Sequence, residues 1–163
     1  MSGPGDSGDT DDFRSLVVPR FLRYVRVCTA SDRHVEETPS TPGQWELARL
    51  LAEELRALGL AEVEVTGHCY VLARLPENPP GPQNAGPENP AGAPAIGLLA
   101  HLDTAQDVSG QDVKPVLVEH YDGKKITLNG GAVLDPAADP DLAAQRGRAI
   151  IHTDGSTLLG ADD

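Results

Sequence analysis

The sequence lacks the features of a membrane-spanning, secreted or disulfide-stabilised protein. It holds only two cysteines in 163 residues, Cys28 and Cys69, which lie far apart and match no metal-binding or redox spacing. We interpret them as reduced thiols and expect a cytoplasmic protein. No apolar run approaches the roughly 20 residues that a bilayer requires, and the N-terminus has neither the basic start nor the apolar stretch of a secretory signal.

Basic residues are also scarce. The chain has 13 Lys and Arg against 25 Asp and Glu, a formal net charge of −12. Because its bases form no stripe, the chain has no electrostatic footprint for nucleic acid. The acidity is compatible with metal cations or ammonium-bearing substrates, but by itself it argues only for solubility.

The composition divides the chain unevenly. Residues 1–12 have low hydrophobicity and four aspartates, so we expect a disordered acidic tail there and one domain over residues 13–163. Residues 76–94 hold seven of the 14 prolines. No helix or central strand tolerates that density, so we interpret this segment as a flexible surface insertion.

Two helices are predicted before the first strands. Apolar residues recur at helical spacing over residues 13–27, which indicates an amphipathic helix. A second helix is predicted to begin after Thr41, because a hydroxyl N-cap, a proline and then Gln44 form a start signal. Gly59 stands where a left-handed cap would end it. The expected apolar stripe of this helix comprises Trp45, Ala48, Leu51, Leu55 and Leu58.

Strands make up the rest of the expected fold. Short ones are predicted at 61–65, 70–75, 113–119, 125–128 and 147–153. The continuous apolar run at 95–100 is typical of a strand buried on both faces in the middle of a sheet. Helices first, strands between them and a buried central strand predict an α/β domain.

Chemistry-bearing side chains directly follow the buried run. In extended backbone, residues two apart point to the same side, so His101 and Asp103 would lie together at the strand end. A metal-bound imidazole needs an acceptor for its second nitrogen, and a nearby carboxylate is the common choice. Alone this signal is weak, because such a pair also occurs by chance.

A second candidate lies at the end of the sequence, where Asp162 and Asp163 follow two small residues. Adjacent carboxylates repel unless they are solvated or neutralised, and one carboxylate can bridge two metal ions roughly 3.5–4 Å apart. Taken by itself, an exposed acidic turn is the better interpretation.

Taken together, the motifs resemble those of the peptidase T family, tripeptide aminopeptidases of the co-catalytic zinc exopeptidase class. Three blocks carry the resemblance in the expected order: residues 39–45, residues 95–104 with their continuation at 109–110 and 113–115, and residues 153–163. The similarity runs from about residue 13 to the end and is interrupted mainly by the proline-rich insertion.

The resemblance implies a fold and roles for residues. The fold would be the N-terminal part of a three-layer αβα catalytic domain with a mixed central sheet. His101 would be a ligand of one metal, Asp103 the carboxylate that supports this histidine, and Asp162 the ligand that bridges two zinc ions, followed by Asp163. The substrates would be short peptides, and the full-length protein could form a homodimer.

The resemblance also implies that ligands and a general base are missing. The family continues with a glutamate base and further ligands beyond Asp163, so we expect a truncated chain that is inactive alone and binds metal weakly. A deacylase or carboxypeptidase of the same class, or a non-catalytic interaction module, are alternatives that the sequence leaves open. His120 and His152 are better interpreted as ordinary polar residues than as ligands.

Overall fold

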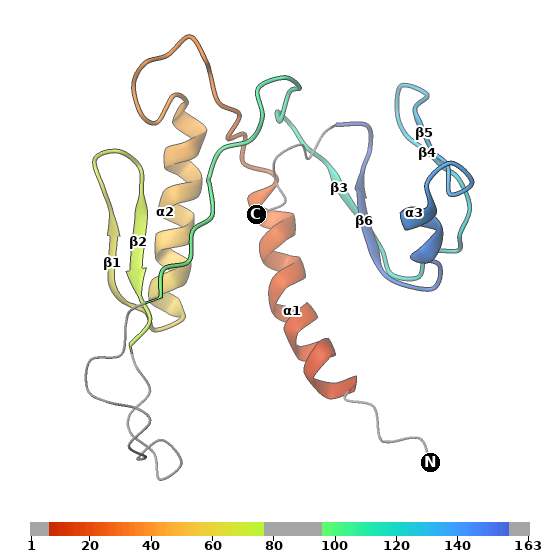
Figure 1. Cartoon of the computed structure of the whole chain (residues 1–163), viewed down its shortest axis with the longest axis horizontal. Helices are drawn as coiled ribbons and strands as arrows, with labels where there is room; N and C mark the ends of the chain where they lie inside the picture. The colour runs from red at the N-terminus through yellow and green to blue at the C-terminus, as the bar shows by residue number, and fades with distance from the viewer. Residues whose placement is uncertain (1–6, 77–95, 157–163) are drawn as a thin grey trace.

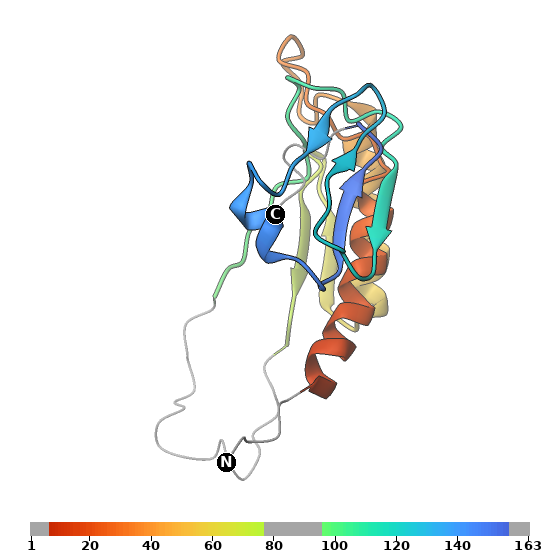
Figure 2. The same cartoon turned by 90° about the vertical axis from the view of Figure 1, so that its right-hand side faces the viewer.

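The computed structural model describes residues 7–76 and 96–156. Their elements are α1 (Ser7–Tyr24), α2 (Pro42–Ala57), β1 (Ala61–Val65), β2 (Val71–Arg74), β3 (Pro115–Val118), β4 (Ile126–Thr127), β5 (Val133–Leu134), α3 (Pro140–Ala144) and β6 (Ile150–Thr153). Figure 2 shows α1 and α2 on one side of the strands and α3 on the other. The predicted α/β class is confirmed. Within the described ranges, no helix is both long and apolar enough to cross a membrane.

Helix α1 begins earlier than predicted, at Ser7, so part of the expected tail is helical. A polar stretch shows no apolar periodicity, yet its backbone can still form the i→i−4 hydrogen bonds of a helix. The helix ends at Tyr24, and one further turn is closed by the Val25 amide donating to the Phe21 carbonyl at 3.1 Å. Residues 1–6 of the predicted tail, and residues 77–94 of the predicted insertion, lie outside the described residues.

A shared carboxylate fastens α1 to α2. Glu54 of α2 accepts a hydrogen bond from Arg20 Nε at 3.1 Å, and it also pairs with Arg23 and with the Tyr24 hydroxyl. The Glu54 side chain is only 17% exposed. Burial raises the pKa of Tyr24, although Arg23 and Arg20 act in the opposite direction. The phenol is therefore a stable donor to the carboxylate near neutral pH.

Helix α2 starts and stops where the sequence predicts. Thr41 is the N-cap residue with extended backbone, although its hydroxyl makes no capping hydrogen bond. At the other end Gly59 adopts a left-handed φ of 84°, and its amide donates to the Arg56 carbonyl at 3.0 Å. The Leu60 amide donates to the Leu55 carbonyl at 3.0 Å, which completes a Schellman motif.

The buried face of α2 differs from the predicted stripe. Its buried residues are Gln44, Leu47, Ala48 and Ala52, while Leu58 is 58% exposed. Helix α2 packs on the antiparallel hairpin of β1 and β2, and Figure 1 shows the helix beside these two strands. The predicted stripe is confirmed at Ala48, which is buried, and is wrong at Leu58, while Trp45, Leu51 and Leu55 are half-buried. The prediction also left out Gln44, a polar residue whose side chain is turned inward and donates a hydrogen bond to the backbone of a neighbouring loop.

The described strands pair as three separate antiparallel sheets, β1–β2, β3–β6 and β4–β5. Parallel pairing among the described residues occurs as an isolated bridge between Ala30 and Thr104. The mixed central sheet is therefore not formed within the described ranges and stays a prediction for a longer protein.

The predicted buried strand at 95–100 is not observed. Residues 96–100 form no strand, and Ile96, Leu98 and Leu99 are 88%, 94% and 98% exposed. A strand that is apolar on both faces needs strands at both edges and helices over both faces. No described element supplies them, so the run is extended and uncovered.

Candidate metal centre

The candidate metal centre lies where two segments that are far apart in the sequence run side by side. The loop after α1 runs beside the residues that follow His101, joined by the bridge between Ala30 and Thr104. The Ser31 amide donates to the Thr104 carbonyl at 3.0 Å, and the Thr104 amide donates to the Thr29 carbonyl at 3.2 Å. These main-chain hydrogen bonds fix the backbone next to Asp103 without depending on any side chain.

The structure brings His101 and Asp103 together. His101 Nδ1 lies 3.3 Å from Asp103 Oδ1, and the two side chains are 48% and 46% exposed. The second carboxylate oxygen, Asp103 Oδ2, accepts a hydrogen bond from the Ser31 hydroxyl. One carboxylate is thus shared between an imidazole and a hydroxyl.

These side chains line a hollow of about 450 Å³, formed by Ser31, His101, Asp103, Thr104, Ala105, Gln106 and Asp107. Further along the same two segments, the Arg33 amide donates to Gln106 Oε1 at 2.8 Å, and Arg33 Nη2 lies 3.2 Å from Asp107 Oδ1. The two segments are therefore linked at the bridge and again at Arg33. Its wall offers carboxylate and imidazole groups, the donor types that suit zinc.

Helix α2 contacts the loop after α1, which forms part of the wall of the hollow. Thr29 is 2% exposed, and its carbonyl accepts a hydrogen bond from Gln44 Nε2 at 3.3 Å. A Cβ added to Gly43 would lie 1.7 Å from the Cys28 carbonyl oxygen, so the start of α2 touches the loop backbone directly. Only glycine allows this approach. The cap region of α2, the loop after α1 and the His101 segment therefore form one connected unit.

Of the second candidate segment, residues 153–163, the structure describes residues 153–156. After β6, the Asp154 carboxylate accepts hydrogen bonds from the Ser156 hydroxyl at 2.8 Å and the Ser156 amide at 3.3 Å. Its pKa is lowered by these hydrogen bonds, the hydroxyl first, with help from Lys114. Gly155 has a φ of 124°, and a Cβ there would meet the Asn129 carbonyl at 2.6 Å. The predicted turn is thus present. Asp162 and Asp163 lie outside the described residues.

The other histidines stay apart from this hollow. His152 lies on β6, and its Nδ1 is 2.7 Å from the Thr153 carbonyl oxygen, while His120 is exposed. Across residues 7–76 and 96–156, no group of three or more His, Cys, Asp or Glu could hold a metal ion. His101 and Asp103 would therefore need a ligand from outside the described residues.

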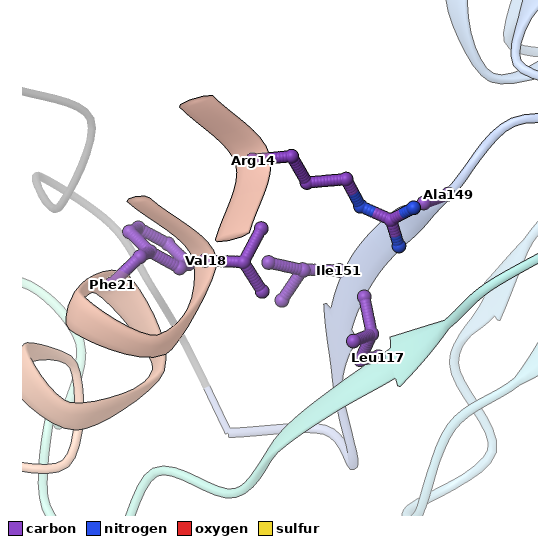
Figure 3. Close-up of a pocket in the computed structure, with 6 residues that line it drawn as sticks. All are labelled: Arg14, Val18, Phe21, Leu117, Ala149 and Ile151. Atoms are coloured by element: carbon purple, nitrogen blue, oxygen red, sulfur yellow. The ribbon is translucent and has the colours of Figure 1, made fainter. Parts of the chain in front are cut away.

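A second hollow lies between α1 and the β3–β6 sheet (Figure 3). It is lined by Arg14, Val18, Phe21, Leu117, Ala149 and Ile151. Val18 and Ile151 point toward one another, and Arg14 reaches across from α1 and pairs with Glu119. None of these six described lining residues carries a carboxylate, an imidazole or a hydroxyl.

Ser31 is a residue of the candidate site that the sequence does not predict. This residue lies in a polar, charged loop that shows no periodicity, and its partner Asp103 is 72 positions away. Its contact depends on the pairing of two loops, which no local pattern reports. The serine hydroxyl beside the carboxylate is therefore information that the structure adds.

Comparison with known proteins first indicates a class: the curated relatives that the chain resembles are named as peptidases. No family model matches the chain.

The relatives are, in particular, peptidase T proteins. The chain is 46% identical over 152 residues to peptidase T of Geobacillus sp. (strain WCH70), an alignment that covers 92% of the chain and 35% of the relative. Against peptidase T of Alkaliphilus oremlandii (strain OhILAs), the identity is 47% over 149 residues, which is 90% of the chain and 34% of the relative. Peptidase T of Brevibacillus brevis is 46% identical over 152 residues, again 92% of the chain and 35% of the relative. The resemblance to peptidase T is confirmed, and the chain spans about a third of the length of these relatives.

Proposed function

We propose that the chain is part of a longer zinc-dependent aminopeptidase (the full-length protein), which releases the N-terminal residue from short peptides. The observation that carries this proposal is the pairing of His101 Nδ1 with Asp103 Oδ1 at 3.3 Å in a hollow walled by a second loop. An imidazole whose one nitrogen is engaged by a carboxylate is the usual form of a histidine ligand. Similarity to peptidase T supports the choice of a peptide as the substrate.

The residues present fit a zinc ligand and its supporting carboxylate. Asp103 would accept the Nδ1–H of His101 and so favour the tautomer that carries its lone pair on Nε2, the form in which an imidazole binds a metal through that nitrogen. When bound, zinc would supply an activated water, because coordination lowers the pKa of bound water to about 7. Asp162 would provide the carboxylate that bridges two ions. Asp103 would not touch the substrate, so it is a positioning residue.

The domain assignment and the assembly belong to the same proposal. Residues 13–163 would form the N-terminal portion of the catalytic domain, with residues 76–94 as a surface insertion, and the full-length protein would be cytoplasmic and could form homodimers. The uncovered side chains of Ile96, Leu98 and Leu99 support a longer protein, because large apolar patches on a soluble domain are normally covered by something.

The chain alone would be inactive. Catalytic zinc ordinarily has three protein ligands plus water, and the described residues offer no such group. A zinc titration of the isolated chain should give weak binding. Tight, stoichiometric binding would contradict this part of the proposal.

A direct test compares three substrates with the purified full-length protein. We expect turnover of a tripeptide with a free amino terminus, loss of turnover when that terminus is acetylated, and no hydrolysis of an N-acyl amino acid. A chelator should abolish the activity, and added zinc should restore it. Preference for the N-acyl amino acid or for cleavage at the carboxyl end would instead indicate a deacylase or a carboxypeptidase, and chelator-resistant turnover would contradict the metal mechanism.

A further inference from the structure

We propose that Ser31 is a positioning residue of the metal centre, which orients Asp103 and through it the imidazole of His101. This inference rests on the proposed function and extends it by one residue. The contact that carries it is the hydrogen bond from the Ser31 hydroxyl to Asp103 Oδ2, on the opposite oxygen from the one that faces His101.

The two oxygens of a carboxylate are chemically equivalent unless a neighbouring group binds one of them. An aspartate side chain rotates freely enough about its last bond that a half-exposed carboxylate samples many orientations. Here the hydroxyl of Ser31 holds Oδ2, which keeps Oδ1 directed at His101 Nδ1 at 3.3 Å. The imidazole plane is then fixed by a partner that is itself fixed. Carboxylates near metal-bound histidines generally depend on such outer hydrogen bonds.

Ser31 is well placed for this role because its backbone is immobilised independently of the hydroxyl. Its amide donates to the Thr104 carbonyl at 3.0 Å, and the neighbouring Thr29 carbonyl accepts from the Thr104 amide at 3.2 Å and from Gln44 of α2 at 3.3 Å. Removing the hydroxyl therefore leaves the pairing of the two loops intact. The effect of such a change should appear in metal binding and not in folding.

The test measures zinc affinity of the full-length protein by competition with a chromophoric chelator. Ser31→Ala should bind zinc about tenfold more weakly than wild type, at the lower end of the 10–100-fold range for groups around metal ligands, because Ser31 acts through Asp103. Ser31→Thr, which keeps a hydroxyl, should restore the affinity. Ser31→Cys, which keeps the shape but has a weak donor, should resemble Ser31→Ala.

Two further variants distinguish failure of the role proposed for Ser31 from failure of the proposed function. Ser109→Ala removes a hydroxyl from the loop that follows His101, where among the described residues it accepts a hydrogen bond from the Gln111 amide, so this change should leave zinc affinity unchanged. His101→Ala should lose zinc binding much more severely. If His101→Ala loses zinc and Ser31→Ala binds it within twofold of wild type, or if Ser31→Thr fails to rescue, the role of Ser31 is refuted. If His101→Ala binds zinc like wild type, the proposed function itself fails.

Discussion

Replacing Gly43 by alanine should destabilise the protein through a single backbone contact. The new Cβ would lie 1.7 Å from the Cys28 carbonyl oxygen and 2.8 Å from its carbon, far inside van der Waals contact. Neither atom can rotate out of the way, because both belong to the main chain. The start of α2 and the loop after α1 must therefore separate by more than about 1 Å.

The magnitude follows from two opposing effects. Overpacking costs about 1–3 kcal/mol, and the upper part of that range applies because a backbone atom is struck. Alanine regains at most about 1 kcal/mol over glycine in a helix. We therefore expect a net loss of about 2 kcal/mol in the free energy of unfolding. The displaced loop should also loosen the hydrogen bond between Thr29 and Thr104, so zinc affinity should fall as well.

The assay is urea denaturation of the full-length protein, with Gly67→Ala as the matched control. An added Cβ at Gly67 meets nothing within 4 Å, and its φ lies outside the left-handed region, so this control should change stability by no more than about 0.5 kcal/mol. Equal stability of Gly43→Ala and Gly67→Ala would refute the close packing of α2 against the loop.

Three other changes give distinct results. Asp103→Ala should abolish turnover of the full-length protein while its far-ultraviolet circular dichroism stays unchanged. Asp141→Ala, which removes an exposed carboxylate on α3 that does not line the hollow, should keep near-normal activity. Near-normal activity of Asp103→Ala would refute its assigned role. Glu54→Gln should lower the free energy of unfolding by about 1–2 kcal/mol, because it weakens the shared charged hydrogen bonds to α1. Glu53→Gln, at an exposed position, should cost almost nothing in the same melt. Equal melting of the two variants would refute the link between α1 and α2 through Glu54. The lowered pKa of Asp154 means that its stabilisation is complete above the ordinary value of 3.8 and is lost as pH falls through the lower folded value. Asp154→Asn should therefore flatten the loss of thermal stability below about pH 4, and unchanged acid melts would show that its hydrogen bonds do not matter for folding.

Local signals explain which parts of the fold were predictable. The start of α2 after Thr41, its end at Gly59 and the bounds of β1 depend on neighbouring residues, so the sequence indicates them. Two short elements, β5 and α3, are below the length at which periodicity is visible. For α3 a signal did exist: Asp139 caps the helix by accepting from the amides of Asp141 and Leu142 at 3.0 and 3.1 Å.

Only the part of the site that lies within one short segment was predictable from the sequence. The spacing of His101 and Asp103 was enough to predict that they meet, because both belong to one short segment. Ser31 and the support by Gln44 arise from contacts between segments far apart in the chain, and no pattern within either segment reports them. The exposed run at 96–100 shows the opposite case: its composition predicts burial, but burial requires covering elements that the described residues do not provide.

The proposed function requires that His101 and Asp162 bind the same divalent ion. The most direct measurement is a crystal structure of the full-length protein with zinc, in which anomalous scattering locates the metal. We expect an ion about 2.0–2.1 Å from His101 Nε2, with the Asp162 carboxylate on the same ion and Asp103 on the Nδ1 side of the ring. A metal bound elsewhere, or His101 and Asp162 on opposite sides of the domain, would contradict it.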